Sequence, residues 1–245
     1  MKIGIFGDVH GNLAGLEAVL AALQAERCEK YLCTGDLVGY GPHPGACIRR
    51  VRELGAACVL GNHDEYATDI LGHGLERLEP DTRQVIEWTR ANTPMEDLKW
   101  LAALPRHLHF PELDLEMAHG SLGHAPWAYL VNVANLTEHF SHQKARVCIV
   151  GHSHLPLLCH QREGHPPTME FLKSGVLPPD GKVVFNPGAV GQPRDRDPRA
   201  AACVLDTAAG HLHLLRVGYD IAAVQADMQA GHFPERFIQR IALGK

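Results

Sequence analysis

The sequence predicts an α/β fold, and three observations lead to this prediction. Apolar strand-like runs alternate with amphipathic helices through the first third of the chain. Five short clusters of Asp, His and Asn follow strand-like runs within residues 8–154. The second half is richer in strands, which indicates a second sheet. Strands that alternate with helices favour a parallel sheet with right-handed crossovers, so the first three strands should share one sheet.

The first third is predicted to follow a β-α-β-α-β order. Residues 2–7, 30–35 and 56–61 are the apolar runs that we expect to form strands. Asn12 can cap a first helix, because the leucines that follow it recur at helical spacing. Pro44 can open a second helix, since its fixed φ suits a first helical turn, and a glycine can close it.

Residues 65–105 interrupt this alternation and predict helices without a strand. Pro80 and Pro94 each precede apolar residues at helical spacing. We expect a helical insertion beside the functional site, acting either as a substrate lid or as a structural cap without substrate contact. Its Trp88 and Trp100 could pack on the chain's own core or on a second subunit of a homo-oligomer.

The second half is predicted to contain five strands and three helices. The strands are expected over residues 113–118, 146–151, 183–186, 201–206 and 211–217. The helices are expected over residues 135–145, 220–230 and 234–243. We assign the last three strands to the second sheet, with a hairpin turn at 207–210, and the Gly- and Pro-rich residues 161–181 to an irregular surface arm. No repeat or linker is evident, so residues 1–245 are expected to form one domain.

Composition narrows the class of protein. The 245 residues carry a formal net charge of −5 with neutral histidines, so no basic field exists to attract nucleic acid or an anionic membrane. No stretch approaches the ~18–20 apolar residues of a membrane span. The seven cysteines form no C-x-x-C pair, and the N-terminal apolar run is too short for a signal-peptide core. We therefore expect buried free thiols and a cytoplasmic protein.

The five polar clusters carry the predicted chemistry. They are Asp8-Val9-His10, Gly35-Asp36, Gly61-Asn62-His63-Asp64, Ala118-His119-Gly120 and Gly151-His152-Ser153-His154. Because parallel strands end on one edge of a sheet, ligands on five strand ends should converge in one crevice. Each cluster alone is often a cap or a turn, and their joint order is what predicts a site for two divalent cations. Two cations about 3.5–4 Å apart are the usual device for hydrolysing phosphate esters.

The residue types within the clusters suggest separate tasks. Side chains two positions apart point to the same side of an extended chain, so Asp8 can act with His10, and His152 with His154. Asp36 can bridge two cations, with one oxygen on each. The imidazole ligands favour Mn, Fe, Zn, Co or Ni over Mg or Ca.

The third and fourth clusters add a neutral ligand and an acid. Asn62 offers a carbonyl oxygen, and His119 is a lone imidazole after a strand. The side chain of His63 diverges from that of Asn62, so it need not bind the same metal. His63 could instead donate a proton to a leaving alkoxide. Asp64 is one candidate to orient the His63 ring.

Polar residues outside the clusters offer weaker signals. Residues 186–195 form a turn-rich loop whose free N–H groups and arginines could meet a phosphate oxyanion. Asn12 and Arg194 are the candidate substrate-binding residues, although a structural turn with solvated arginines explains the loop equally well. The other twelve of the 17 histidines, among them His124 and His142, follow no ligand spacing, and we expect them to be exposed or hydrogen-bonded.

On these clusters the chain resembles the calcineurin-like metallophosphoesterase superfamily. That family carries D-x-H, G-D, G-N-H-[DE], a lone H and G-H-x-H in this order, and residues 8–154 match every element. Residues 186–195 look like the short bacterial and archaeal phosphodiesterase branch. The resemblance implies a four-layered α/β/β/α sandwich. It also implies hydrolysis of a small phosphodiester or phosphoester substrate by a hydroxide that a metal pair activates.

The resemblance further implies a role for each residue of the clusters. Asp8, His10, Asp36 and His154 would hold the first metal, and Asp36, Asn62, His119 and His152 would hold the second. His63 would be the catalytic general acid. We expect two divalent ions, with Mn favoured and Fe, Zn, Ni, Co or Mg as alternatives.

One departure from the superfamily separates the candidate activities. Its protein Ser/Thr phosphatases carry Asp-Arg-Gly after the second cluster, whereas residues 35–41, Gly-Asp-Leu-Val-Gly-Tyr-Gly, contain no arginine. This disfavours a phosphoprotein phosphatase and a dinucleoside-tetraphosphate hydrolase, and a phosphodiesterase is the leading hypothesis. The alternatives are a phosphomonoesterase or nucleotide pyrophosphohydrolase, a non-catalytic metal-binding scaffold, and a nuclease, which the acidic balance disfavours.

Overall fold

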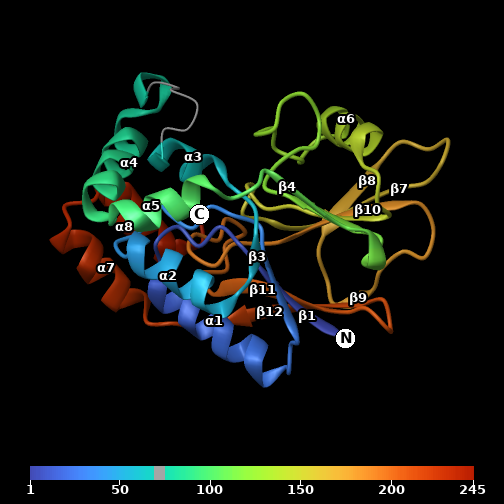
Figure 1. Ribbon diagram of the computed structural model, residues 1–245, viewed down its shortest axis with the longest axis horizontal. Coiled ribbons are helices and arrows are strands. Elements are labelled where there is room, and N and C mark those ends of the chain that lie inside the picture. Colours follow the sequence, from blue (N-terminus) through green and yellow to red (C-terminus); the bar gives the residue numbers. More distant parts are fainter. Residues whose placement is uncertain (69–74) are drawn as a thin grey trace.

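Two six-stranded sheets pack face to face in a computed structural model that describes residues 1–68 and 75–245 (Figure 1). The first sheet has the order β3-β2-β1-β11-β12-β9. Its strands are β1 (Lys2–Phe6), β2 (Lys30–Cys33), β3 (Ala57–Cys58), β9 (Gly175–Val176), β11 (Ala200–Asp206) and β12 (His211–Val217). The strands β1, β2 and β3 pair in parallel, as the β-α-β-α-β pattern predicts.

The second sheet has the order β4-β5-β6-β10-β7-β8. Its strands are β4 (His107–Phe110), β5 (Leu115–Ala118), β6 (Val147–Ile149), β7 (Pro156–Gln161), β8 (Thr168–Phe171) and β10 (Lys182–Pro187). Its central strands β5, β6 and β10 pair in parallel, and the outer pairs are antiparallel. Both sheets are therefore mixed, with a parallel group of three strands in each.

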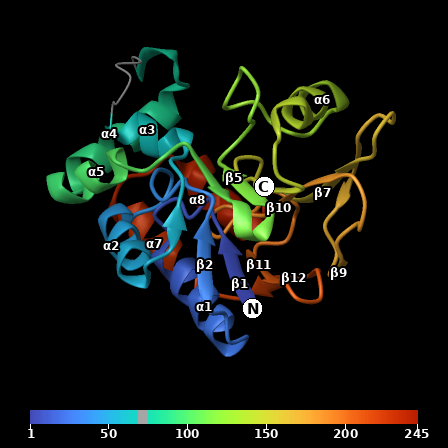
Figure 2. The same cartoon turned by 45° about the vertical axis from the view of Figure 1, so that its right-hand side comes forward.

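Helices cover the outer faces of both sheets. They are α1 (Leu13–Ala25), α2 (Pro44–Leu54), α3 (Asn62–Thr68), α4 (Pro80–Asn92), α5 (Met95–Ala102), α6 (Val133–His142), α7 (Ile221–Ala230) and α8 (Glu235–Leu243), with short 3₁₀ turns at Leu75–Arg77 and Pro111–Leu113. Figures 1 and 2 show α1 and α2 beside the first sheet and α6 beside the second. This layering confirms the predicted four-layered α/β/β/α sandwich.

Alternating side chains build the layers. On β1, Ile3 and Ile5 enter the core between the sheets, whereas Phe6 belongs to the core beneath α1 and α2. On β6, Val147 and Ile149 face the core between the sheets, and the neighbouring Cys148 packs in the cluster with α6. Because successive side chains of a strand point to opposite faces, each strand of the two sheets can bury both of its faces.

The assignment of residues 201–206 and 211–217 to the second sheet was wrong. The strand β11 pairs antiparallel with β1, with Ile3 opposite Leu205, and β12 pairs with β11 in the predicted hairpin. Sequence periodicity identifies a strand but not its neighbour, and β11 covers the edge of β1 that β2 leaves open.

Two further expectations need correction. Residues 161–181 include β8 and β9 and are not only an irregular arm. The strands β4 and β7 were not predicted, since β4 alternates exposed and half-buried positions and carries only a weak apolar signal.

Helices occupy the described part of the region in which we expect a helical insertion. The helices α3, α4 and α5 occupy most of residues 65–105, while residues 69–74 lie outside the described part. Trp88 contacts Phe233 with ring centroids 4.7 Å apart, and Trp100 packs against the core beneath α1 and α2. Both tryptophans are therefore used by the chain's own core.

Two expectations from composition can be compared with the structure. All seven cysteines are free thiols, and Cys33, Cys58, Cys148 and Cys203 are buried in strands as expected. Among the described residues, no helix has the length and apolar character that a membrane crossing requires.

Candidate metal centre

The five clusters converge at the ends of strands from both sheets. The first three follow β1, β2 and β3 of the first sheet, and the last two follow β5 and β6 of the second. We call the seven predicted ligands the candidate centre: Asp8, His10, Asp36, Asn62, His119, His152 and His154. All seven are at most 8% exposed, so seven polar side chains are buried together at this site. The ligands thus come from two facing sheets rather than from the single edge expected.

The backbone at the candidate centre adopts an unusual conformation. Asp8, His10, Asp36, His152 and His154 have φ values of 48°, 49°, 53°, 68° and 59°. Residues other than glycine rarely adopt this left-handed region, because the Cβ approaches the backbone carbonyl. Such strain persists where surrounding structure enforces it, and it is concentrated at functional sites.

The side chains form two groups that share one residue. Asp8, His10, Asp36 and His154 each place a potential ligand atom within 4.8 Å of the others, and Asp36, His119 and His152 do the same. The Asn62 Oδ1 atom lies 3.1 Å from the Nε2 atom of His119 and so joins the second group. These groups have the same members as the two ligand sets implied by the resemblance.

Hydrogen bonds to backbone carbonyl oxygens orient the four imidazoles and decide which ring nitrogen faces the centre. His10, His119 and His154 each direct Nδ1 at a backbone carbonyl oxygen, at 3.0, 2.7 and 2.6 Å. A carbonyl oxygen can only accept, so in the neutral rings Nδ1 carries the proton and Nε2 presents a lone pair. His152 uses the opposite nitrogen: its Nε2 donates to the Trp127 carbonyl oxygen at 2.9 Å, which leaves Nδ1 for a ligand.

The inner lone pairs of His10 and His154 face one another without a proton between them, since their Nε2 atoms are 3.0 Å apart and both rings are neutral. The Nε2 of His119 instead carries a proton and lies 3.3 Å from the Oδ2 of Asp36. Two acceptors 3.0 Å apart repel each other, whereas a cation placed between them would be bound by both. The donor set, of imidazole nitrogens, carboxylates and one amide oxygen, therefore fits first-row divalent metals.

The ionisation of the histidines agrees with this fit at three positions. Burial lowers the pKa of His152 to about 3 and holds the pKa values of His10 and His154 well below the ordinary histidine value. These rings are consequently neutral near pH 7, and their lone pairs are available without loss of a proton.

His119 and Asp8 hold protons that a cation would displace. Burial lowers the pKa of His119, but the carboxylates of Asp36 and Asp8 outweigh it and raise this pKa to about 10. Burial also raises the pKa of Asp8 to about 7. Metal ligands must be deprotonated, so metal loading would release protons from both groups and would be favoured at higher pH.

His63 lies at the edge of the candidate centre and is 6% exposed. Its ring centroid is 4.8 Å from that of His10 and 4.5 Å from that of Tyr40. Its buried Nδ1 has no hydrogen-bond partner among the described residues, and burial together with the charge of Arg194 lowers its pKa to about 4. The backbone N–H of His63 donates to the Asp36 Oδ1 at 2.8 Å, which couples the two residues.

Asp64 holds the backbone of the centre and makes no hydrogen bond with the His63 ring in the described structure. Its fully buried carboxylate accepts N–H bonds from Asp36, Leu37, Val38 and Gly61 at 2.8, 2.8, 3.2 and 3.0 Å. A Cβ at position 61 would lie 2.1 Å from the Asp36 Oδ1, so this approach requires glycine. Asp64 thus fixes the loop that presents Asp36.

Asp64→Asn is expected to lower the free energy of unfolding of the metal-free protein by about 3 kcal/mol, because an amide group replaces part of a carboxylate that accepts four buried N–H bonds. Chemical denaturation in the presence of a chelator measures this change in the free energy of unfolding. The matched control is Asp206→Asn, since Asp206 also accepts two backbone N–H bonds but lies in the surface hairpin turn, where the loss should be much smaller. Equal losses in the two variants would contradict the role given to Asp64.

The two candidate substrate-binding residues lie in different settings. Asn12 caps α1 through an N–H bond from Gly15 at 2.9 Å, as predicted, and its Nδ2 donates to the Gly191 carbonyl at 3.2 Å. Its buried amide is thus engaged by the chain, and we leave Asn12 out of the proposed substrate site. Arg194 donates to the Gln192 Oε1 at 3.1 Å, but its buried Nε has no partner among the described residues.

Several residues around the candidate centre were not predicted. The ring of Tyr129 stacks on His152 with centroids 4.2 Å apart, and Trp127 contacts His119 edge-on at 5.8 Å. Arg240 of α8 donates through Nε to the Lys245 oxygen at 2.8 Å, and burial and the charge of Arg194 lower its pKa. No motif marks these positions, and only the aromatic pair, eight and ten residues after His119, could have been suspected from chain proximity.

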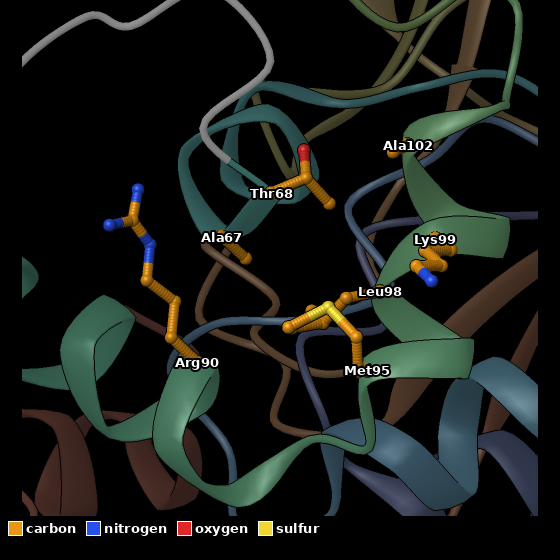
Figure 3. A pocket seen from close by; sticks show the side chains of 7 residues that line it. All are labelled: Ala67, Thr68, Arg90, Met95, Leu98, Lys99 and Ala102. Atoms are coloured by element: carbon orange, nitrogen blue, oxygen red, sulfur yellow. The ribbon is translucent and has the colours of Figure 1, made fainter.

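The helical insertion contains a separate cavity of about 320 Å³ (Figure 3). Met95 and Leu98 of α5 form part of its wall, with Arg90 and Lys99 on opposite sides. None of the seven residues of the candidate centre lines it. A smaller cavity of about 170 Å³ does reach the centre, because His119 lines it together with Arg106 and Trp127.

Comparison with known proteins agrees with the class that this fold and site define, a metal-dependent phosphoesterase. The family model of the calcineurin-like phosphoesterase superfamily domain matches residues 1–210. The chain therefore belongs to the calcineurin-like phosphoesterase superfamily, which confirms the resemblance found in the sequence.

Individual relatives differ in how much of the chain they share. The crystal structure of a metallophosphoesterase from Sphaerobacter thermophilus is similar with a TM-score of 0.85 and 37% identity, over 100% of this chain and 99% of that one. An uncharacterized protein of Methanocaldococcus jannaschii is 32% identical over 99% of this chain and 98% of its own length. A symmetrical bis(5'-nucleosyl)-tetraphosphatase of Pectobacterium carotovorum is 36% identical over 125 residues, 50% of this chain and 44% of that enzyme. This match therefore covers less than half of that enzyme.

Proposed function

We propose that this protein hydrolyses phosphodiester bonds of a small substrate with the help of two divalent cations bound at the candidate centre. The observation that carries the proposal is the pair of buried ligand groups that share Asp36. The unprotonated Nε2 atoms of His10 and His154 face each other there at 3.0 Å, and the proton of His119 beside the Asp36 Oδ2 is one that a cation would displace. Such an arrangement is unfavourable without cations and favourable with them.

The resident residues divide into two ligand sets. Asp8, His10, Asp36 and His154 would hold one cation, and Asp36, Asn62, His119 and His152 would hold the other. When bound, the pair would supply an activated nucleophile and positive charge to the phosphoryl oxygens. Mn is the favoured ion, since imidazole-rich sites with carboxylates suit first-row metals, and cellular availability decides among them.

His63 is proposed as the general acid. It stands beside the candidate centre without being a member of either ligand group. An anionic phosphate ester next to the ring would favour its protonated form, opposing the burial that lowers its pKa in the free protein. His63 could then transfer that proton to the leaving alkoxide.

Two arginines are proposed to bind the non-reacting phosphoryl oxygens. The role of Arg194 is supported by its backbone N–H, which donates to the His154 carbonyl oxygen at 3.3 Å, and by its charge, which lowers the pKa values of His63 and His154. The end of α8 lies beside the loop that carries Arg194, because the Arg196 N–H donates to the Gly244 carbonyl oxygen at 2.8 Å. Arg240 of this helix donates through Nε to the Lys245 oxygen at 2.8 Å, and neither arginine pairs with an Asp or Glu among the described residues. Two guanidiniums that no described Asp or Glu neutralises favour binding of a phosphate group. The two arginines would supply the positive charge that residues 35–41, which contain no arginine, do not provide.

The remaining surroundings would shape the substrate site. The 170 Å³ cavity beside His119 is proposed to accept an organic group of the substrate against Trp127. We also infer that the described residues of the insertion, 65–68 and 75–105, form a wall of the site, because Tyr66 of α3 has its ring centroid 6.1 Å from that of His63. Residues 1–245 would act as one domain, since Phe237 of α8 contacts Tyr40, which contacts His63.

The test is restoration of activity after metal removal. Chelation should reduce hydrolysis of bis-p-nitrophenyl phosphate to background, and Mn²⁺ should restore it with a kcat/KM at least about tenfold above that for p-nitrophenyl phosphate, a difference of about 1.4 kcal/mol. Metal content is measured in parallel. A monoester preference would replace the diester proposal, and no turnover with two bound metals would favour a non-catalytic scaffold.

A second panel of substrates would narrow the choice of natural substrate. Cyclic nucleotides test small diesters, and the relatives named as tetraphosphatases make diadenosine tetraphosphate a necessary member. A higher kcat/KM for the tetraphosphate than for every diester would identify a nucleotide pyrophosphohydrolase, despite the missing arginine in residues 35–41.

A further inference from the structure

A second type of ligand cluster lies on the surface, outside the candidate centre. His124, Glu138 and His142 each place one potential ligand atom within 4.8 Å of the others, and we call them the surface triad. Glu138 and His142 are one turn apart on α6, so both side chains lie on the same face of the helix. His124 comes from residues 120–132, the loop that joins β5 to α6. Spacing along the chain does not reveal this cluster, because fourteen residues separate His124 from Glu138.

The donor atoms of the surface triad suit a transition metal. Two imidazoles and one carboxylate are the protein ligands of many zinc sites that keep a fourth position for water. Oxygen-preferring Mg²⁺ and Ca²⁺ would find only one carboxylate here. The rings of His124 and His142 meet edge-on with centroids 5.0 Å apart, and neither ring nitrogen makes a hydrogen bond with a described residue. Their lone pairs are therefore not engaged by the described chain.

The loop is held against α6 by hydrogen bonds of its own. The backbone N–H of His124 donates to the Glu138 Oε1 at 2.8 Å, and that of Leu122 donates to the buried Nδ1 of His139 at 3.1 Å. A Cβ on Gly123 would lie 2.7 Å from the Glu138 Oε1, so glycine permits this close approach. Ligands that are held in place before binding lose less conformational freedom when they bind.

The same loop reaches the candidate centre at its other end. The Trp127 carbonyl oxygen accepts the Nε2 proton of His152, and Tyr129 stacks on that ring. Residues between the surface triad and His152 thus belong to one loop that α6 anchors. Figure 1 shows this loop and α6 together on the side of the second sheet.

We propose that His124, Glu138 and His142 bind one first-row transition-metal ion of the Zn²⁺ type, which ties the loop of residues 120–132 to α6. This third site is separate from the two ligand groups of the candidate centre, with which it shares no residue. Binding there does not depend on the proposed function. Through Trp127, the ion would also restrain the hydrogen bond that orients His152.

The experiment measures how many Mn²⁺ and Zn²⁺ ions the intact protein binds. The candidate centre is first filled with Mn²⁺, excess ion is removed, Zn²⁺ is added, and both metals are counted after desalting. We expect the total to rise from two to three metal ions per chain, whether or not Zn²⁺ also replaces Mn²⁺ at the candidate centre. His142→Ala, His124→Ala and Glu138→Gln should each weaken this Zn²⁺ by about 100-fold or more, since loss of outer-sphere partners alone costs about 10–100-fold. Glu138→Gln keeps an oxygen for the His124 N–H and so preserves the loop contact.

Two controls test whether the added Zn²⁺ binds at the surface triad. His213→Ala removes an exposed histidine of β12 and should leave the added Zn²⁺ unchanged. Amide hydrogen exchange of residues 120–132 should slow on Zn²⁺ addition in the parent protein and not in His142→Ala. Equal Zn²⁺ binding by the parent and all three triad variants would overturn the proposal, as would Zn²⁺ uptake matched by an equal loss of Mn²⁺. None of these readings uses hydrolysis, so failure here is distinct from failure of the proposed function.

Discussion

Asp36→Asn is expected to lower kcat/KM for a diester by about 10³-fold, which corresponds to about 4 kcal/mol of transition-state stabilisation. Asp36 is the residue shared by the two ligand groups. Its Oδ2 lies 3.6 Å from the His10 Nε2 and 3.3 Å from the His119 Nε2, so one carboxylate serves both. The amide keeps the size of the side chain but removes the negative charge that offsets repulsion between two cations.

The measurement for Asp36→Asn combines metal content with steady-state kinetics. At saturating Mn²⁺ the parent protein should retain two ions and the variant at most one. Asp180→Asn is the control, because Asp180 is an exposed carboxylate far from any predicted ligand in the sequence. A variant that kept two ions and a near-parental kcat/KM would show that Asp36 does not bridge the centre.

His63→Asn should reduce kcat by about 10²–10⁴-fold for a substrate whose leaving group is a ribose alkoxide, since general acid catalysis contributes on this scale. The loss should be at least about tenfold smaller for bis-p-nitrophenyl phosphate, because nitrophenolate is stable without a proton. Metal content should not change, since His63 belongs to neither ligand group.

The dependence on the leaving group distinguishes an acid from a structural residue. A merely structural His63 would reduce both reactions by the same factor or would release a metal. His165→Asn, which changes an exposed histidine on a surface turn, is the matched control and should alter neither rate. Equal losses for the two leaving groups with two metals retained would remove His63 from the role of acid.

The candidate centre was easier to predict from the sequence than the two sheets were. Asp8 and Asp36 follow the parallel neighbours β1 and β2, so reading these two strands correctly was enough to place them near one another. His119 follows β5 of the second sheet, and only the packing of the two sheets brings it to Asp36. Which strands are neighbours depends on long-range pairing, and for that reason β11 was assigned to the wrong sheet. Periodicity reports which face is buried, not which strand lies alongside.

Long-range packing also explains the functional residues that were missed. Arg240 belongs to an amphipathic helix whose pattern predicts only that one face is buried. The place of α8 arises from its packing, with Phe237 against Tyr40 and the Arg196 N–H bonded to the Gly244 carbonyl oxygen. Likewise His124 and His142 looked like ordinary exposed histidines, and only the course of the loop over α6 brings them to Glu138.

The pairing of β1 with β11 has a consequence for the order of folding. Residue 2 lies opposite residue 206, so the first strand cannot gain this neighbour until almost the whole chain has been synthesised. The turn after β1 also cannot complete its contacts until late, because the Val190 and Gly191 N–H groups donate to the Gly7 and Asp8 carbonyl oxygens. Contacts between such distant segments make folding slow, and the uncovered edge of β1 is a template for wrong pairing in the meantime. The nascent chain would therefore be most exposed to aggregation before residues 190–206 emerge.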